Sequence, residues 1–118
     1  MDNEGIEPTL AVQTTVEEYS TVIVLEGELD LGTVDDLQDA VDEALGAGAR
    51  HVTIDCRGIT FVDSSGLRCL LDTKAKAPLG VALLQPSSSL LRLLEITSLD
   101  SMLPVFNDLE ALRADLDS

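Results

Sequence analysis

Short apolar runs, either alternating with polar residues or dense in β-branched side chains, predict the strands of this chain. The run at residues 10–16 partly alternates, and the run at residues 20–25 (STVIVL) is β-branched and apolar. Further apolar runs at residues 51–56, 80–84 and 102–106 predict three more strands. We expect the Gly-Glu-Leu-Asp segment after the second run to break that strand, and the stretch between the third run and Asp63 to form a loop.

Apolar residues at helical spacing predict four helices. The clearest spans residues 33–45, where an apolar stripe faces inward and the intervening acids face solvent. A second helix is expected from residue 64 to about residue 76, and a third opens at the serines of residues 87–89, which suit a helix N-cap. The last helix is expected to begin with a capping box formed by Asn107 and Glu110.

The order of these elements predicts an α/β fold. Strands that alternate with helices build layered domains with a mostly parallel sheet, whereas two strands joined by a tight turn pair antiparallel. We therefore expect a mixed, mostly parallel sheet of about five strands with about four helices. With 118 residues, the chain is long enough for one hydrophobic core and too short for two. The expected domain covers residues 9–118, after a flexible segment at residues 1–8.

Composition and charge narrow the classes of function. No apolar run approaches the length that spans a bilayer, and the acidic N-terminus lacks the basic region of a signal peptide, so a cytoplasmic protein is expected. The net charge is −15, and residues 1–49 hold 13 acidic and no basic side chains. This charge disfavours nucleic-acid binding and suits encounter with a basic protein surface; the competing interpretation is a solvated acidic face.

The chain offers little metal or redox chemistry. Cys56 and Cys69 lie in apolar sequence and are expected to be small buried side chains. His51 is the single histidine, which excludes a site with several histidine ligands. We expect no cofactor and no metal.

The Asp-Ser-Ser-Gly-Leu segment after the third predicted strand carries the clearest chemical signal. It places two hydroxyls at the start of a helix, where free N–H groups and the positive dipole end favour negative charge, including a covalently attached phosphate. A phosphate on Ser64 would leave the helix intact but would crowd Asp63, Glu28 and Asp30 against a docked partner. The competing interpretation is that Ser64 and Ser65 only cap the helix.

The residues around Ser64 disfavour catalysis. The first glycine of a G-x-S-x-G nucleophile elbow is missing, and no base is identifiable that would activate the hydroxyl. Both glycine-rich phosphate-binding motifs are absent. A phospho-aspartate receiver built on Asp30, Asp55 and Asp63 would need a lysine after the last strand, and none stands there. We expect no catalytic residue and no enzyme activity.

Three segments carry a resemblance to a known family. They are Gly-Glu-Leu-Asp followed by TVDDLQDAVDEAL, then VTIDCRGITFVDSSGLRCLL, and finally LLRLLEITSLDSMLPVFNDLEAL. Over residues 10–116 the chain resembles the STAS-domain anti-sigma factor antagonists of bacteria. It departs from them at Ser98, where members often carry glycine, so the turn there must form without a residue that adopts a positive φ freely. It also departs at Cys56, which replaces an aliphatic residue.

The resemblance implies a partner-switching cycle. In this family the first serine of the motif, here Ser64, is phosphorylated by an anti-sigma factor that is itself an ATP-dependent serine kinase. The unphosphorylated form binds that kinase and frees the sigma factor, and a PP2C-type phosphatase restores it. The resemblance also implies a docking surface made of Glu28, Asp30, Asp63, Ser65, Gly66 and Leu67. The alternative is a STAS scaffold subunit of a stress-signalling or lipid-transport complex, without phospho-switching.

Overall fold

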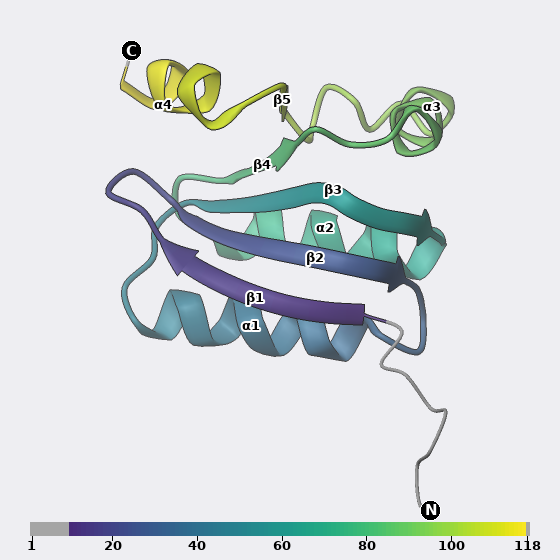
Figure 1. The fold of residues 1–118 in the computed structure, drawn as a ribbon, viewed down its shortest axis with the longest axis horizontal. Helices are drawn as coiled ribbons and strands as arrows, with labels where there is room; N and C mark the ends of the chain where they lie inside the picture. Colours follow the sequence, from purple (N-terminus) through teal and green to yellow (C-terminus); the bar gives the residue numbers. More distant parts are fainter. Residues whose placement is uncertain (1–9, 118) are drawn as a thin grey trace, which may run out of the picture.

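The computed structural model of the protein describes residues 10–117 and has the expected α/β class (Figure 1). Its elements are, in chain order, β1 (Leu10–Val16), β2 (Thr21–Leu29), α1 (Val34–Gly46), β3 (Val52–Val62), α2 (Ser64–Lys76), β4 (Val81–Leu84), α3 (Ser88–Ile96), β5 (Val105–Phe106) and α4 (Leu109–Asp117). The sheet has the order β1-β2-β3-β4-β5; β1 is antiparallel to β2, and the other pairs are parallel. The segment expected to be flexible, residues 1–8, lies outside the described residues.

The core lies between the sheet and the two helices α1 and α2, which cover one of its faces, while α3 and α4 lie along the β4–β5 edge (Figure 1). Ile23 of β2 and Ile54 of β3 are register partners and are fully buried. Leu37 of α1 and Leu70 of α2 are fully buried in the same cluster. Each such side chain contributes about 1.5–3 kcal/mol by leaving water. The single hydrophobic core expected from the sequence is therefore present.

Strands β2 and β3 extend further than the sequence pattern predicts. β2 does not break at Gly27, and the segment expected to be a loop before Asp63 belongs to β3. The reason is mutual pairing: Glu28 lies opposite Phe61, and β3 accommodates one extra residue at each of two register shifts, opposite Val24–Glu26 and opposite Gly27–Glu28. A Cβ atom on Gly58 would lie 2.9 Å from the carbonyl oxygen of Leu25, so glycine allows the two strands to approach there. The prediction of a break and a loop was wrong.

The starts of α3 and α4 differ in how well the sequence predicts them. The Ser87 side chain accepts a hydrogen bond from the Leu90 N–H at 3.1 Å, which confirms the predicted serine cap of α3. At α4 the cap is Asp108, whose Oδ1 accepts from the Ala111 N–H at 2.7 Å. The predicted Asn107 cap was wrong by one residue, because aspartate and asparagine are equally good caps and stand side by side here.

Helices α1 and α3 end in the same hydrogen-bonded motif with different residues at its left-handed position. At α1 the N–H of Ala49 donates to the Ala44 carbonyl, and Gly48 between them has φ 104°. At α3 the N–H of Leu99 donates to the Leu94 carbonyl, and Ser98 has φ 60°. These are Schellman motifs, in which glycine is preferred. The turn at the end of α3 thus forms without a glycine, and Ser98 itself adopts the positive φ.

A pair of reciprocal substitutions tests this backbone strain. Ser98→Gly is expected to raise the free energy of unfolding by about 0.5–1 kcal/mol, since a left-handed L-residue costs about 1–2 kcal/mol and the added freedom of the unfolded chain returns part of it. Gly48→Ser is expected to lower it by at least as much, because no atom lies within 4 Å of the added Cβ position and only the backbone is affected. Urea denaturation measures both. Shifts in the same direction would contradict the strain argument.

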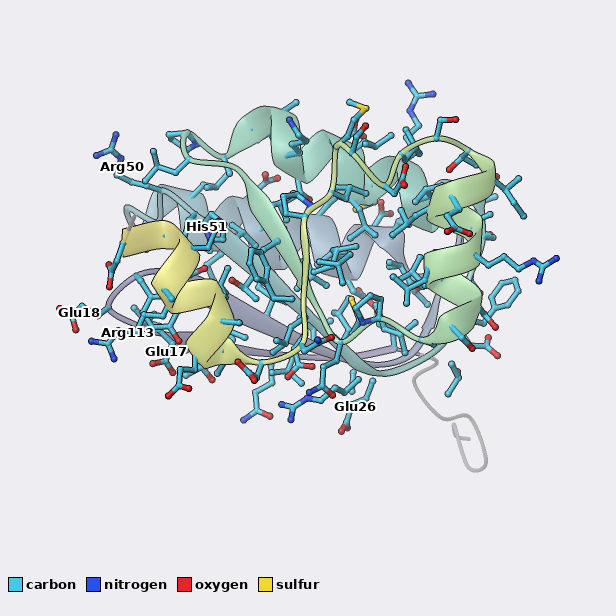
Figure 2. All side chains as sticks on the ribbon, turned by 90° about the horizontal axis from the view of Figure 1, so that it is seen from above. Glu17, Glu18, Glu26, Arg50, His51 and Arg113 are labelled. Carbon is cyan, nitrogen blue, oxygen red and sulfur yellow. The ribbon has the colours of Figure 1, made fainter. Side chains whose placement is uncertain are left out.

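A buried polar cluster lies at the start of β3, at the opposite end of this strand from Ser64. The Ser20 Oγ lies 2.7 Å from Nδ1 of His51 and 2.7 Å from the Thr53 hydroxyl, and His51 is 5% exposed. Figure 2 shows His51 beside α4, at the end of the molecule that also holds Arg113. Burial holds the pKa of His51 below its usual value, although the Asp115 carboxylate acts in the opposite direction. The folded protein therefore keeps His51 neutral.

This lowered pKa predicts a loss of stability in mild acid. Below about pH 6.5 the unfolded chain binds a proton at His51 that the folded chain resists, so the stability contributed by this group falls as pH drops from 7 to 5.5. The slope is at most about 1.4 kcal/mol per pH unit for one proton. In His51→Gln this component is absent, while carboxylate titrations are common to both proteins. Denaturation at several pH values measures the difference, and parallel pH profiles would contradict the prediction.

Candidate functional site

Asp63 forms the junction between β3 and α2. It is the N-cap of α2: its side-chain Oδ1 accepts a hydrogen bond from the Gly66 N–H at 2.9 Å. Its other oxygen, Oδ2, accepts from the N–H of Leu31 at 3.2 Å. Its backbone N–H donates to the Leu29 carbonyl at 3.2 Å, and its carbonyl accepts from the Leu67 N–H at 3.0 Å. One residue therefore connects the ends of β2 and β3 with the first turn of α2.

Because Asp63 caps the helix, the two serines have no structural duty there. Ser64 occupies the first position of α2 and is exposed, and Ser65 is half-buried. Within residues 10–117, neither hydroxyl makes a hydrogen bond to protein. The interpretation that Ser64 and Ser65 only cap the helix was wrong, because an aspartate one position earlier already satisfies the exposed N–H group. The Ser64 hydroxyl is accessible at a positive helix end.

The turn between β2 and α1 lies against this junction. The Asp30 side-chain Oδ1 accepts from the Gly32 N–H at 3.0 Å. The buried Thr33 hydroxyl accepts from the Asp30 N–H at 3.0 Å and donates to the Glu28 carbonyl at 2.8 Å. The structure thus joins Glu28 and Asp30 in one hydrogen-bonded turn, which reaches Asp63 through the Leu31 N–H. The Glu28 side chain is exposed, and Asp30 is half-buried.

Two of the expected docking residues face inward. Leu67 is 5% exposed and belongs to the hydrophobic core, and Gly66 is buried. A Cβ atom at Gly66 would lie 2.5 Å from the carbonyl oxygen of Leu29 and 2.9 Å from its side chain. Glycine therefore lets the first turn of α2 approach the end of β2. Gly66 and Leu67 therefore pack beneath the exposed surface of the site, and they present no side chain to a partner.

Two exposed apolar side chains beside the junction were not singled out from the sequence. Leu31 is 75% exposed in the β2–α1 turn, and Phe61 is 51% exposed near the end of β3. Phe61 lies opposite Glu28 in the sheet. A usable sequence signal existed for Leu31, since an apolar residue stands alone between Asp30 and Gly32. The sequence pattern predicts a loop at Phe61, so it gives no indication that this side chain is exposed on a strand.

The carboxylate of Asp55, which a phospho-aspartate receiver would need, is already paired in this structure. Asp55 is 2% exposed and is held by Arg57, whose Nη2 lies 2.7 Å from Oδ2. These hydrogen bonds hold the pKa of Asp55 below its usual value against the effect of burial, which acts to raise it. The carboxylate is therefore occupied, unlike the acceptor of a receiver domain. Within the part of the chain that is described, no group of three or more His, Cys, Asp or Glu side chains could hold a metal ion.

Both cysteines are free and buried, as the sequence predicts. Burial raises the pKa of the Cys56 thiol to about 12 and that of Cys69 to about 11. Neither thiol is ionised near neutral pH, so neither has the thiolate character that reactive cysteines need.

The close approach at Gly66 predicts a large effect of a single methyl group. Gly66→Ala is expected to lower the free energy of unfolding by about 1–3 kcal/mol, since the added Cβ meets a backbone oxygen that cannot move aside easily. Gly46→Ala is the matched control: that glycine also lies in a helix, but no atom lies within 4 Å of its Cβ position, and alanine there is expected to be neutral or stabilising. Chemical denaturation measures both, and equal stabilities would refute the prediction.

Among residues 10–117, every helix is too short or too polar to span a membrane.

Comparisons with known proteins agree with this architecture. An anti-sigma factor antagonist from Mycobacterium paratuberculosis is 21% identical with a TM-score of 0.82, over 92% of this chain and 95% of that one. A STAS domain protein from Planctomyces limnophilus is 22% identical with a TM-score of 0.79, over 91% and 98%.

The Bacillus cell fate determinant SpoIIAA in its phosphorylated form is 27% identical with a TM-score of 0.66, over 88% of this chain and 98% of that one. The sequence model of the STAS domain matches residues 8–112, nearly the whole chain. The chain therefore belongs to the STAS domain family.

Proposed function

We propose that this protein is an anti-sigma factor antagonist whose partner binding is switched off by phosphorylation of Ser64. Its unphosphorylated form binds an anti-sigma factor that is a serine kinase. The sigma factor that was bound to this kinase is then released. A PP2C-type phosphatase removes the phosphate and restores binding. The cycle takes place in the cytoplasm and needs no catalytic residue, cofactor or metal in this chain.

One observation carries the proposal: the Ser64 hydroxyl is exposed at the first position of α2 and has no part in holding the fold. The cap is supplied by Asp63, so the Ser64 hydroxyl gives up no hydrogen bond of its own to the domain when it is modified. Helix N-termini stabilise anions, and a phosphoserine there is compatible with the helix.

The transfer of phosphate to Ser64 needs no catalytic group from this chain. The γ-phosphoryl group of ATP passes to the Ser64 oxygen, the bond to the bridging oxygen breaks and ADP leaves. The serine proton goes to a base on the kinase. The product carries about −1.5 to −2 additional charges beside Asp63. A partner that fits the unphosphorylated surface then meets like charges and a bulky hydrated group, and a penalty of about 3 kcal/mol would weaken binding more than 100-fold.

Substitutions at Ser64 test the proposal. Ser64→Ala should bind the partner as the wild type does and should accept no phosphate. Ser64→Asp should weaken binding by about tenfold or more, because one added charge enters the docking surface, with little change in thermal stability. The partner is recovered with Ser64→Ala as bait, and titration calorimetry measures its affinity for each variant.

Ser88 offers a matched control in the same chain. It also occupies the first position of a helix, follows the capping residue Ser87, and is exposed. Ser88→Asp should leave the affinity for the partner unchanged. Undiminished binding of Ser64→Asp, together with no phosphate on Ser64 after incubation with the kinase and ATP, would refute the switch and favour the scaffold alternative.

A further inference from the structure

The two oxygens of the Asp63 carboxylate serve two different elements. Oδ1 accepts from the Gly66 N–H of α2 at 2.9 Å, and Oδ2 accepts from the Leu31 N–H of the β2–α1 turn at 3.2 Å. We propose that Asp63 is a positioning residue that holds Leu31 ready for the partner, and that phosphate on Ser64 acts partly by releasing this turn. The inference rests on the proposed function for its partner, but its geometry stands independently.

The turn is arranged so that its apolar residue projects outward. Leu31 is 75% exposed, although its backbone N–H is tied down by Asp63. On either side of it, the Asp30 side chain binds the Gly32 N–H and the buried Thr33 hydroxyl binds the Asp30 N–H. Ordering the backbone of a turn before docking removes part of the entropy cost of binding. Leu31 therefore fits an apolar recess in a partner, surrounded by groups that complement the acids Asp30 and Glu28.

A phosphate on Ser64 would compete with the Asp63 carboxylate for the N–H groups of the first turn of α2. The phosphoserine is adjacent in sequence, carries about −1.5 to −2 charges, and has three acceptor oxygens within reach of the first-turn N–H groups. Two anions cannot share one helix N-terminus without repulsion, and the Gly66 N–H has a new acceptor available. Displacing the Asp63 carboxylate leaves the Leu31 N–H to solvent. The negative charge of the phosphate on Ser64 thereby removes a hydrogen bond from the turn that presents Leu31.

Substitutions at Asp63 separate its two roles. In Asp63→Ser the hydroxyl can still cap the helix, as Ser87 does for Leu90 at 3.1 Å in α3, but it is too short to reach Leu31 as well. In Asp63→Ala both acceptors are lost. The readout is the solvent-exchange rate of individual amide protons, measured by NMR on the free protein.

In Asp63→Ser the Leu31 amide should exchange roughly three- to tenfold faster, the loss expected for one hydrogen bond, while the Gly66 amide stays protected. In Asp63→Ala both amides should exchange faster. An unchanged Leu31 amide in Asp63→Ser would overturn the proposed tie.

The effect of phosphate can be measured without a kinase. Phosphoserine is installed at residue 64 by genetic-code expansion, and at residue 88 as the matched control, since Ser88 also begins a helix. With phosphoserine at 64 the Leu31 amide should exchange roughly three- to tenfold faster while Gly66 stays protected, and with phosphoserine at 88 neither should change. A Leu31 amide that is insensitive to phosphoserine at 64 would overturn the coupling.

Binding of the recovered partner tests the role of the Leu31 side chain. Leu31→Ser should weaken binding about tenfold or more. Leu79→Ser, at a leucine that is 59% exposed and bonded through its N–H to the Arg50 carbonyl near the start of β3, should not change it. Equal effects of the two substitutions would overturn this role. If no partner is captured, the proposed function fails while the amide measurements still decide the coupling.

Discussion

The candidate site depends on the two hydrogen bonds that the Asp63 carboxylate accepts. A carboxylate that accepts two backbone N–H groups forms hydrogen bonds to a charged acceptor, which are stronger than neutral ones. In the same residue, the backbone N–H and carbonyl connect to Leu29 and Leu67, so the end of β2, the end of β3 and the start of α2 are fixed by one position. Since this residue supplies the cap, the next residue is free to carry chemistry.

The backbone around this carboxylate leaves little room for alternatives. Glycine at position 66 lets α2 reach the carbonyl of Leu29, and the extended pairing of β2 with β3 brings Glu28 and Phe61 side by side. Strand ends in a parallel sheet are a common place for a working surface, because loops there are held by a rigid scaffold. Here the scaffold positions an exposed hydroxyl and an exposed leucine on two segments joined by one carboxylate.

Much of the fold followed from the sequence, and the parts that did not have identifiable causes. Helical periodicity located α1 and α2 closely, because their apolar stripes are regular. Glycines at positions 27 and 58 suggested a break and a loop, yet pairing between the two irregular segments restored the strands. Such pairing is a tertiary effect that local propensity does not report.

The sequence predicts where the candidate site lies in the fold but not how its residues are arranged. The sequence located Ser64 at a helix start, but two serines and an aspartate are all good caps, so it could not decide which of them serves. The exposure of Leu31 depends on how its turn is anchored to Asp63, a residue far away in the sequence. Likewise, the positive φ of Ser98 follows from the hydrogen bonds that end α3, which can force a residue other than glycine into this conformation.

The overall charge indicates why a phospho-switch in this protein would have to be local. The chain carries a net charge of −15, so about two further charges change its long-range field by a small fraction. At physiological ionic strength, fields between exposed charges decay over about 8 Å. Encounter with a basic surface would therefore differ little between the two forms. Discrimination must arise from contacts a few ångströms from Ser64, and the Asp63 carboxylate and the turn that it holds are the groups placed there.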